Sequence, residues 1–201
     1  MNLTFTDYPD KTHHKPYELD GVLRILKNEG VILFPTDTVW SLGCDATDLD
    51  AINRLLHLKS SKDPLHYEIL VDSVEGLKSA IRHLHPRLET LLLYHQRPLS
   101  VMIEKRDLSP GYFPLNHPFL TFRIVKDDYC ENLIRAFDKP LLTTAAATGD
   151  NNIPTSFSAI QHDLAKRVDY IVKRRMDEDG SAELSVMVKL SNRDELVFLR
   201  D

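Results

Sequence analysis

The amino-acid sequence predicts an α/β domain built on a mixed sheet. In the first part of the chain, short apolar runs alternate with segments whose apolar residues recur every three or four positions, which is typical of strands alternating with helices. Towards the C-terminus, apolar runs follow one another at residues 170–172, 184–188 and 196–199. This order favours a mixed sheet over a uniformly parallel one. No linker rich in proline, glycine or serine divides the chain, so we expect one domain.

Length and composition indicate a protein with a sizeable core. The 201 residues suffice for one large α/β domain or two small ones, and 42% of them are hydrophobic. No apolar run is long enough to span a bilayer, and the N-terminus lacks the basic and apolar regions of a secretory signal. The two cysteines, Cys44 and Cys130, are typical of reduced thiols and not of a disulfide framework. We therefore expect a cytoplasmic protein with no membrane partner.

The charge balance argues against a general nucleic-acid binder. The formal net charge is −5, whereas such proteins normally carry a basic excess. A local basic groove remains compatible with the sequence, because four basic residues lie in or beside two predicted strands: Lys105, Arg106, Arg123 and Lys126. The alternative is an ordinary solvated face.

The first half of the chain predicts helices and strands in alternation. After a polar arm at residues 1–15, the domain (residues 16–201) should begin with an amphipathic helix over 17–29 and a buried strand over 31–34. Thr47 or Asp48 can cap a helix to residue 58, and Asp72 or Ser73 can cap another to residue 84. Residues 67–71 predict a strand between these helices, and Pro86 marks the first turn of a helix that ends near residue 95.

The second half of the chain contains more strands. Residues 99–104 and 119–124 predict two strands separated by a loop at 109–114, and a short helix is expected over 131–137. The next strand, at residues 140–144, ends in two hydroxyls, and a turn follows at 148–152. Ser156 or Ser158 is placed to cap a helix through residue 164, before the closing strands.

A concentration of polar side chains follows the first predicted strand. Pro35 ends its ladder pairing, because proline has no N–H to donate, and Thr36, Asp37 and Thr38 then present two hydroxyls and a carboxylate on one turn. Polar groups where a buried strand emerges often form a small-ligand site in α/β proteins. The alternative is a turn whose side chains bond only to neighbouring backbone.

Residues 34–40, Phe-Pro-Thr-Asp-Thr-Val-Trp, and residues 42–46, Leu-Gly-Cys-Asp-Ala, resemble the signature of the YrdC/YciO family. In the family an aromatic residue and a glycine usually stand where this chain has Trp40 and Ser41. The family includes the threonylcarbamoyl-AMP synthases, which make the activated intermediate for a tRNA adenosine modification. The resemblance implies a single YrdC-like domain: a twisted mixed sheet with flanking helices and a large concave groove.

The resemblance also places candidate catalytic and phosphate-binding residues. Lys59 stands at the lysine of the family's Lys-x-Arg motif, but Ser61 stands at the arginine, and Lys62 is the next cation. This exchange is not conservative, because arginine offers phosphate a planar bidentate fork and lysine does not. Arg123 matches the family's strand arginine, and with Lys59 it forms the implied catalytic pair. From its apolar neighbours alone, an internal ion pair with Asp37 or Asp45 is an equal alternative for Arg123.

Further binding residues are implied at three later motifs. Ser100 keeps the hydroxyl of a Pro-Leu-Thr element, and Ser185 keeps one hydroxyl of a Ser-Thr-Val element. The family's Ser-x-Asn motif is reduced: the strand end at Thr143 and Thr144 keeps a hydroxyl, but Ala146 replaces the asparagine and has no polar side-chain atom. For Thr144 and Ser185, hydroxyls bonded to backbone are the alternative. The implied substrate-binding set is Pro35, Thr36, Asp37, Thr38, Lys62, Ser100, Thr143, Thr144 and Ser185.

The resemblance implies an enzyme that forms an adenylate from L-threonine, bicarbonate and ATP, with Mg²⁺ as companion ion and pyrophosphate as product. The retained fold markers and the altered phosphate-handling residues equally suit a YciO-like paralogue that binds nucleotide, double-stranded RNA or tRNA without this activity. A related carbonyl- or phosphate-transferring enzyme is a third alternative. The sequence contains no phosphate-binding loop, no catalytic triad and no cluster of protein ligands at metal-binding spacing.

Overall fold

The computed structural model describes residues 16–59, 66–109, 113, 117–147, 153–178 and 183–201, with the backbone alone at residues 16–18. The predicted arm at residues 1–15, Ser61, Lys62 and the predicted turn at 148–152 lie outside these described residues. In the part of the chain that is described, no helix is long and apolar enough to cross a membrane.

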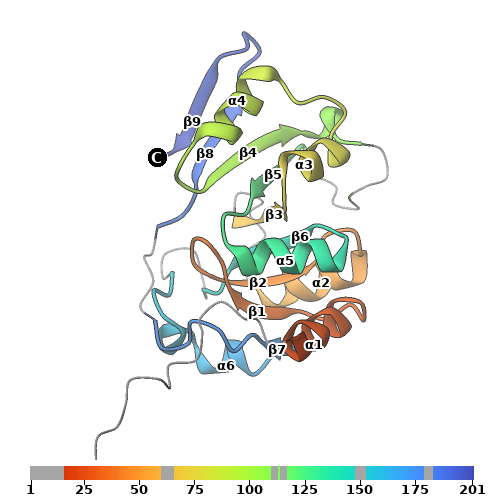
Figure 1. Cartoon of the computed structure of the whole chain (residues 1–201), viewed down its shortest axis with the longest axis vertical. Coiled ribbons are helices and arrows are strands. Elements are labelled where there is room, and N and C mark those ends of the chain that lie inside the picture. The colour runs from red at the N-terminus through yellow and green to blue at the C-terminus, as the bar shows by residue number, and fades with distance from the viewer. Residues whose placement is uncertain (1–15, 60–65, 110–112, 114–116, 148–152, 179–182) are drawn as a thin grey trace, which may run out of the picture.

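One mixed sheet of nine strands runs through the molecule in the order β7-β1-β2-β6-β3-β5-β4-β8-β9 (Figure 1). The pairs β1–β7, β3–β5 and β4–β8 are parallel, and the other neighbours are antiparallel. The predicted mixed α/β fold is therefore confirmed. The strands are β1 (Ile32–Pro35), β2 (Trp40–Asp45), β3 (Glu68–Val71), β4 (Leu99–Glu104), β5 (Phe119–Ile124), β6 (Leu141–Ala145), β7 (Tyr170–Ile171), β8 (Val186–Leu190) and β9 (Leu196–Arg200).

Side-chain caps define where several helices begin. Asp48 accepts from the backbone of Asp50 and Ala51 at the start of α2, and Asp127 accepts from Cys130 N at the start of α5. The helices are α1 (Pro16–Leu26), α2 (Leu49–Leu58), α3 (Val74–Ala80), α4 (Pro86–Tyr94), α5 (Asp128–Phe137) and α6 (His162–Ala165), with short 3₁₀ helices η2 (Lys105–Asp107) and η3 (Phe157–Ala159).

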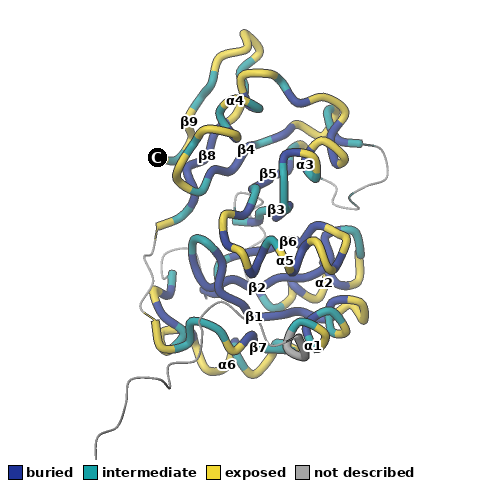
Figure 2. The backbone as a smooth tube through the Cα atoms, in the orientation of Figure 1, coloured by how far each residue is buried: buried dark blue, intermediate teal, exposed yellow. Residues whose placement is uncertain are grey.

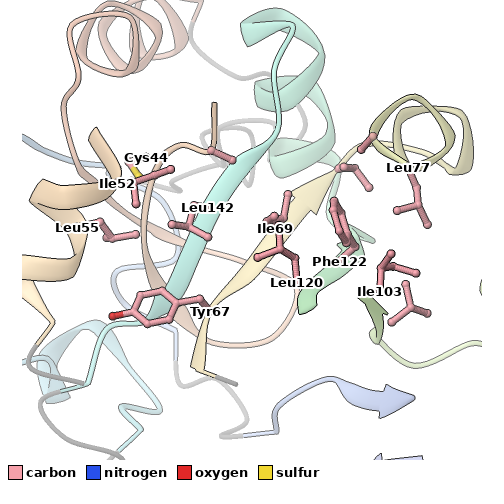
Figure 3. Packing of buried hydrophobic residues seen from close by; sticks show 14 of the residues in the cluster. Cys44, Ile52, Leu55, Tyr67, Ile69, Leu77, Ile103, Leu120, Phe122 and Leu142 are labelled. Carbon is pink, nitrogen blue, oxygen red and sulfur yellow. The ribbon is translucent and has the colours of Figure 1, made fainter. Parts of the chain in front are cut away.

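The helices cover the sheet through two apolar clusters. In the smaller cluster α1 and α5 pack on Ile32 and Phe34 of β1. The larger cluster joins α2, α3 and α4 to the central strands, and Figure 3 shows it extending from Ile52 and Leu55 of α2 across Leu142 to Leu77 of α3. Burial is densest along the central strands, whereas the outer surface of α4 and part of β9 are exposed (Figure 2).

Strand alternation separates the core from a polar face. Phe122 of β5 points into the larger cluster, so its neighbour Arg123 points to the opposite face of the sheet. The register pairs Arg123 with Ser100 of β4 and with Leu70 of β3. Glu68, two residues before Leu70, therefore lies on the same face as Arg123.

Strand β2 is missing from the sequence prediction, which took the residues after the polar turn as part of a motif. The alternation of Trp40, Leu42 and Cys44 with smaller residues was the available signal. These apolar side chains join the larger cluster, while Gly43 faces Phe34 across the β1–β2 hairpin. A Cβ at Gly43 would lie 2.6 Å from a ring atom of Phe34, so this close pairing requires glycine.

Smaller corrections concern element ends. The expected helix cap at Ser156 or Ser158 is wrong: Ser156 precedes η3 without a capping hydrogen bond, and α6 begins later, at His162. Helix α5 starts three residues before the predicted position because Asp127 caps it. Cys44 and Cys130 are free and buried, and burial raises the pKa of both thiols well above the ordinary value.

Candidate functional site

A cavity of about 660 Å³ opens on the polar face of the sheet, and we call it the basin. Strands β2, β3, β4, β5, β6, β8 and β9 contribute to its wall, together with the residue that ends α2. Its polar and charged lining side chains are Thr38, Ser41, Lys59, His66, Glu68, Arg123, Thr143, Thr144, Lys189 and Arg200. Five of the residues singled out in the sequence (Thr38, Lys59, Arg123, Thr143 and Thr144) therefore line one space.

One end of the basin, which we call the β6 end, is formed by Lys59, Thr143 and Thr144. Lys59 ends α2, and its side chain is only 5% exposed. Its Nζ donates to the carbonyl oxygens of Ala145 at 3.2 Å and Ala147 at 2.8 Å, just beyond β6. These two bonds hold the ammonium group at the basin wall.

The two threonines at the β6 end differ in how their hydroxyls are used. Thr143 Oγ1 donates to the carbonyl oxygen of Glu68 at 3.0 Å, whereas the backbone bond offered as the alternative for Thr144 and Ser185 is found for neither hydroxyl among the described residues. Thr144 Oγ1 is buried and has no hydrogen-bond partner among the described residues. Thr121 Oγ1 shares this state but does not line the basin. The register pairs Thr144 with Leu42, so its side chain lies on the face of the larger cluster, opposite to the side chain of Thr143, and its hydroxyl is buried there.

A second part of the basin, which we call the hairpin end because Ser185 and Arg200 flank the β8–β9 hairpin, is organised around Glu68. Its Oε1 atom accepts from Ser100 Oγ and Ser185 Oγ, both at 2.8 Å, and from Arg200 Nη2 at 3.1 Å. Its Oε2 atom accepts from Arg123 Nε at 2.8 Å. Burial by itself would raise the pKa of Glu68, but the charge of Arg123 and the serine hydrogen bonds outweigh it and hold this pKa below its ordinary value.

Arg123 also contacts a second carboxylate, because its Nη1 atom donates to Asp37 Oδ1. The Arg123 side chain is 1% exposed. Burial acts to lower its pKa, but the charges of Glu68 and Asp37 raise it above the ordinary value. The ion pair with Asp37 that the sequence offered as an alternative is therefore present, whereas Asp45 pairs with Lys139 at 2.6 Å.

The polar turn after β1 is divided between two spaces. Thr38 lines the basin, whereas Pro35, Thr36 and Asp37 line a separate cavity of about 200 Å³ that Thr38 also reaches. Thr36 Oγ1 donates to the carbonyl oxygen of Val39 at 2.9 Å and also accepts from Thr38 N. For Thr36, these contacts are those of the hydroxyl-turn alternative.

The remaining predicted binding residues lie behind the lining. Ser100 and Ser185 are buried, contact each other at 2.6 Å and reach the basin through Glu68. The four basic residues considered for a groove do not converge. Arg106 pairs with Glu104 on the surface, and Lys126 Nζ donates to the carbonyl oxygens of His95 and Arg97.

Five charged residues of these two cavities were not singled out in the sequence: Glu68, Lys189 and Arg200 in the basin, and Arg175 and Glu178 in the smaller cavity. Arg175 donates to Thr36 O at 3.1 Å and pairs with Asp127 at 2.5 Å. For Glu68 the available signal was a charged residue at the start of an apolar strand, which requires a partner when it is buried.

The described side chains favour an anionic ligand and do not fit a magnesium ion. The basin lining contains the cations Lys59, Arg123, Lys189 and Arg200 against the single carboxylate of Glu68. That carboxylate and Asp37 are both bonded to guanidinium groups. Among the described residues, no group of three or more histidine, cysteine, aspartate or glutamate side chains is arranged to hold a metal.

Comparison with solved structures shows the fold. P. abyssi Sua5 complexed with L-threonine superposes with a TM-score of 0.78 at 20% identity, over 94% of this chain and 55% of that chain. E. coli YciO gives a TM-score of 0.75 at 18% identity, over 94% of this chain and 91% of that chain. The chain therefore spans about half the length of Sua5 and nearly all of YciO.

Sequence relatives and a family model show the family. A threonylcarbamoyl-AMP synthase of Moraxella catarrhalis is 33% identical over 136 residues, which are 61% of this chain and 65% of that protein. The synthase of Halorhodospira halophila is 25% identical over 166 residues, or 81% of this chain and 85% of that protein. The Sua5_yciO_yrdC family model, described as telomere recombination, matches residues 24–201. With its nine-stranded sheet and its basin, this chain belongs to the Sua5/YciO/YrdC family.

Proposed function

We propose that the basin binds L-threonine and ATP and that the protein forms threonylcarbamoyl-AMP with bicarbonate, in the cytoplasm, for tRNA modification. The observation that carries the proposal is the charge of the basin. In the described part of the chain, its lining contains four cations, Lys59, Arg123, Lys189 and Arg200, against the single carboxylate of Glu68. Relatives named for this activity, at 25% and 33% identity, support the same reaction class.

In this proposal the residues act by position and charge. The ammonium group of Lys59 contacts phosphate oxygens of ATP, and Thr38 lies at the amino-acid side of the basin. Transfer of a nucleotidyl group requires donors directed at developing negative charge, and no covalent nucleophile. Arg123 lines the same basin, and its two carboxylate partners keep its guanidinium group charged.

The direct test is release of pyrophosphate from ATP by the purified protein with L-threonine and bicarbonate in a buffer that contains Mg²⁺. We expect release that requires both L-threonine and bicarbonate. Omission of either substrate is the control, because contaminating ATPases release phosphate independently of threonine. Binding of ATP without threonine-dependent release of pyrophosphate would contradict the proposal.

A second candidate function is that of a YciO-like paralogue, which binds nucleotide, double-stranded RNA or tRNA without forming the adenylate. Two observations favour it: Arg123 is already bonded to Glu68 and Asp37, and the buried Ala146 has no polar side-chain atom. Nucleotide binding without pyrophosphate release supports this candidate. If this candidate binds double-stranded RNA, its affinity for the duplex should fall as the salt concentration is raised, because contacts with the RNA phosphates release counterions.

A further inference from the structure

The hairpin end of the basin contains four donors that converge on one carboxylate. Arg123 and Arg200 each direct a guanidinium N–H at Glu68, and Ser100 and Ser185 direct hydroxyls at it. The two serine hydroxyls carry two hydrogens in total, and they make three short contacts: one from each hydroxyl to Oε1 and one between the hydroxyls. Only one hydrogen can lie between the two serines, so at least one serine donates to Glu68. Paired guanidinium and hydroxyl donors of this kind are what proteins use to bind carboxylate and phosphate ligands.

The donors and the acceptor come from different parts of the chain. Glu68 opens β3, whereas the donors lie on β4, on β5, immediately before β8, and on β9. Glu68, Arg123 and Arg200 line the basin, and the Glu68 side chain is 16% exposed. The carboxylate therefore lies where the two arginines face the cavity, with Ser100 and Ser185 behind it.

Neutralising the charge of Arg123 does not by itself explain why the Glu68 carboxylate is surrounded by these donors. Arg123 already has a carboxylate partner in Asp37, whose side chain is 6% exposed. The two serines carry no charge, yet both are buried against Oε1. Arg200 donates to Ser185 O and Ser185 Oγ as well as to Glu68, so the donors remain positioned by contacts with one another.

We propose that the Glu68 carboxylate occupies an oxyanion subsite of the basin, formed by Ser100, Ser185, Arg123 and Arg200, and that Glu68 is thereby a specificity-determining residue. While it fills the subsite, negative groups of a ligand are restricted to the β6 end. When the Glu68 carboxylate is removed, the four donors accept a carboxylate or phosphate from solution. The proposal is independent of the reaction proposed above, because small anions test it.

The variant Glu68→Ala removes the carboxylate and leaves the donors. Sodium acetate is titrated into this variant and into the wild-type protein, with sodium chloride at equal ionic strength as the reference, and binding is followed by the midpoint of thermal unfolding. We expect saturable stabilisation of the variant by acetate, with an affinity at least about tenfold higher than that of the wild-type protein. Equal responses of the variant to acetate and chloride would overturn the proposal.

Two control variants separate the subsite from general charge effects. Glu104→Ala removes a glutamate at the end of β4 whose side chain is 53% exposed, and we expect no gain in acetate binding. Asp37→Ala removes the other carboxylate on Arg123 and should also give no gain. An acetate affinity in Asp37→Ala as high as in Glu68→Ala would overturn the proposal, because release of Arg123 alone would then explain the binding.

If Glu68→Ala does not fold, Glu68→Gln provides a second test, since it keeps the side-chain volume and removes the charge. Inorganic pyrophosphate is the probe, and its affinity is measured by calorimetry at low salt. We expect an increase of about tenfold over the wild-type protein, because a negative charge in the basin wall is lost, and no increase in Glu104→Gln. An unchanged pyrophosphate affinity in Glu68→Gln would overturn the proposal.

Discussion

At the hairpin end of the basin, the hydroxyls of Ser100 and Ser185 and the guanidinium of Arg200 meet the carboxylate of Glu68. At the β6 end, the hydroxyl of Thr144 meets no acceptor or donor among the described residues. Both ends combine hydroxyls with cations, so residue type alone does not distinguish them. The difference is the acidic side chain of Glu68, which the fold brings to one end, so that the cations at that end already face a negative charge.

The largest expected effect is on stability at the hairpin end. Arg123→Met leaves Glu68 and Asp37 in the interior without their shared cation. Loss of one partner of a buried ion pair typically costs about 3–5 kcal/mol of unfolding free energy. Urea unfolding measures this loss.

The control for Arg123→Met is Arg106→Met, which removes an arginine that is 71% exposed and pairs with Glu104 at 2.9 Å. Its effect should lie within about 1 kcal/mol. Equal effects of the two substitutions would show that the network at the hairpin end is no stronger than a surface pair.

The next effect is on ligand binding at the β6 end. Lys59→Met should lower the affinity for ATP by about 10- to 100-fold, as expected for loss of a charged donor to phosphate. Calorimetric titration measures the affinity, and thermal unfolding checks that the variant is folded. Lys78→Met, at an exposed lysine of α3 that pairs with Glu89, should bind ATP like the wild-type protein. An unchanged affinity in Lys59→Met would remove this residue from the site.

A smaller effect separates the two neighbouring threonines. Thr144→Val removes a buried hydroxyl without a partner, so we expect no loss of stability. Thr143→Val removes a hydrogen bond to Glu68 O and should lose about 1 kcal/mol of unfolding free energy, which urea unfolding measures. If Thr144→Val destabilised the protein as much as Thr143→Val, the contrast between the two hydroxyls would be wrong.

The smallest effect concerns pH. The pKa of Glu68 lies below its ordinary value of 4.5, because Arg123 and the serine hydrogen bonds outweigh the effect of burial. Its charged form therefore stabilises the folded state above that value, and this contribution is lost as pH falls through the lowered pKa. The difference in unfolding free energy between the wild-type protein and Glu68→Gln should shrink as pH falls from the ordinary pKa of 4.5 through the lowered pKa. Urea unfolding at each pH measures it, and a constant difference would contradict the assignment.

The fold was largely predictable because its signals are local. Apolar runs predict most strands, and Asp48 and Ser73 are among the caps that the sequence offered. Strand β2 was not predicted, because its alternation of apolar and small residues lies inside a motif. Its pairing with β1 depends on the fit of Gly43 against the ring of Phe34. Such a contact is decided by the partner strand and cannot be derived from one segment.

The candidate site was predictable only in part, because its contacts are non-local. Lys59 and Thr144 were predicted because they stand at positions of family motifs. The pairing of Arg123 with Asp37 was predictable because a buried arginine needs an anionic partner. The role of Glu68 depends on donors from β4, β5 and β9 and from the residue before β8. Its own strand indicates only that a buried carboxylate needs partners and gives no information on which residues supply them.

The most direct test of the difference between the two ends is a crystal structure of the wild-type protein with a non-hydrolysable ATP analogue. We predict phosphate oxygens within hydrogen-bond distance of Lys59, with Glu68 still accepting from Ser100 and Ser185. Phosphates bound by Ser185 and Arg200, with the Glu68 side chain displaced from them, would contradict the account.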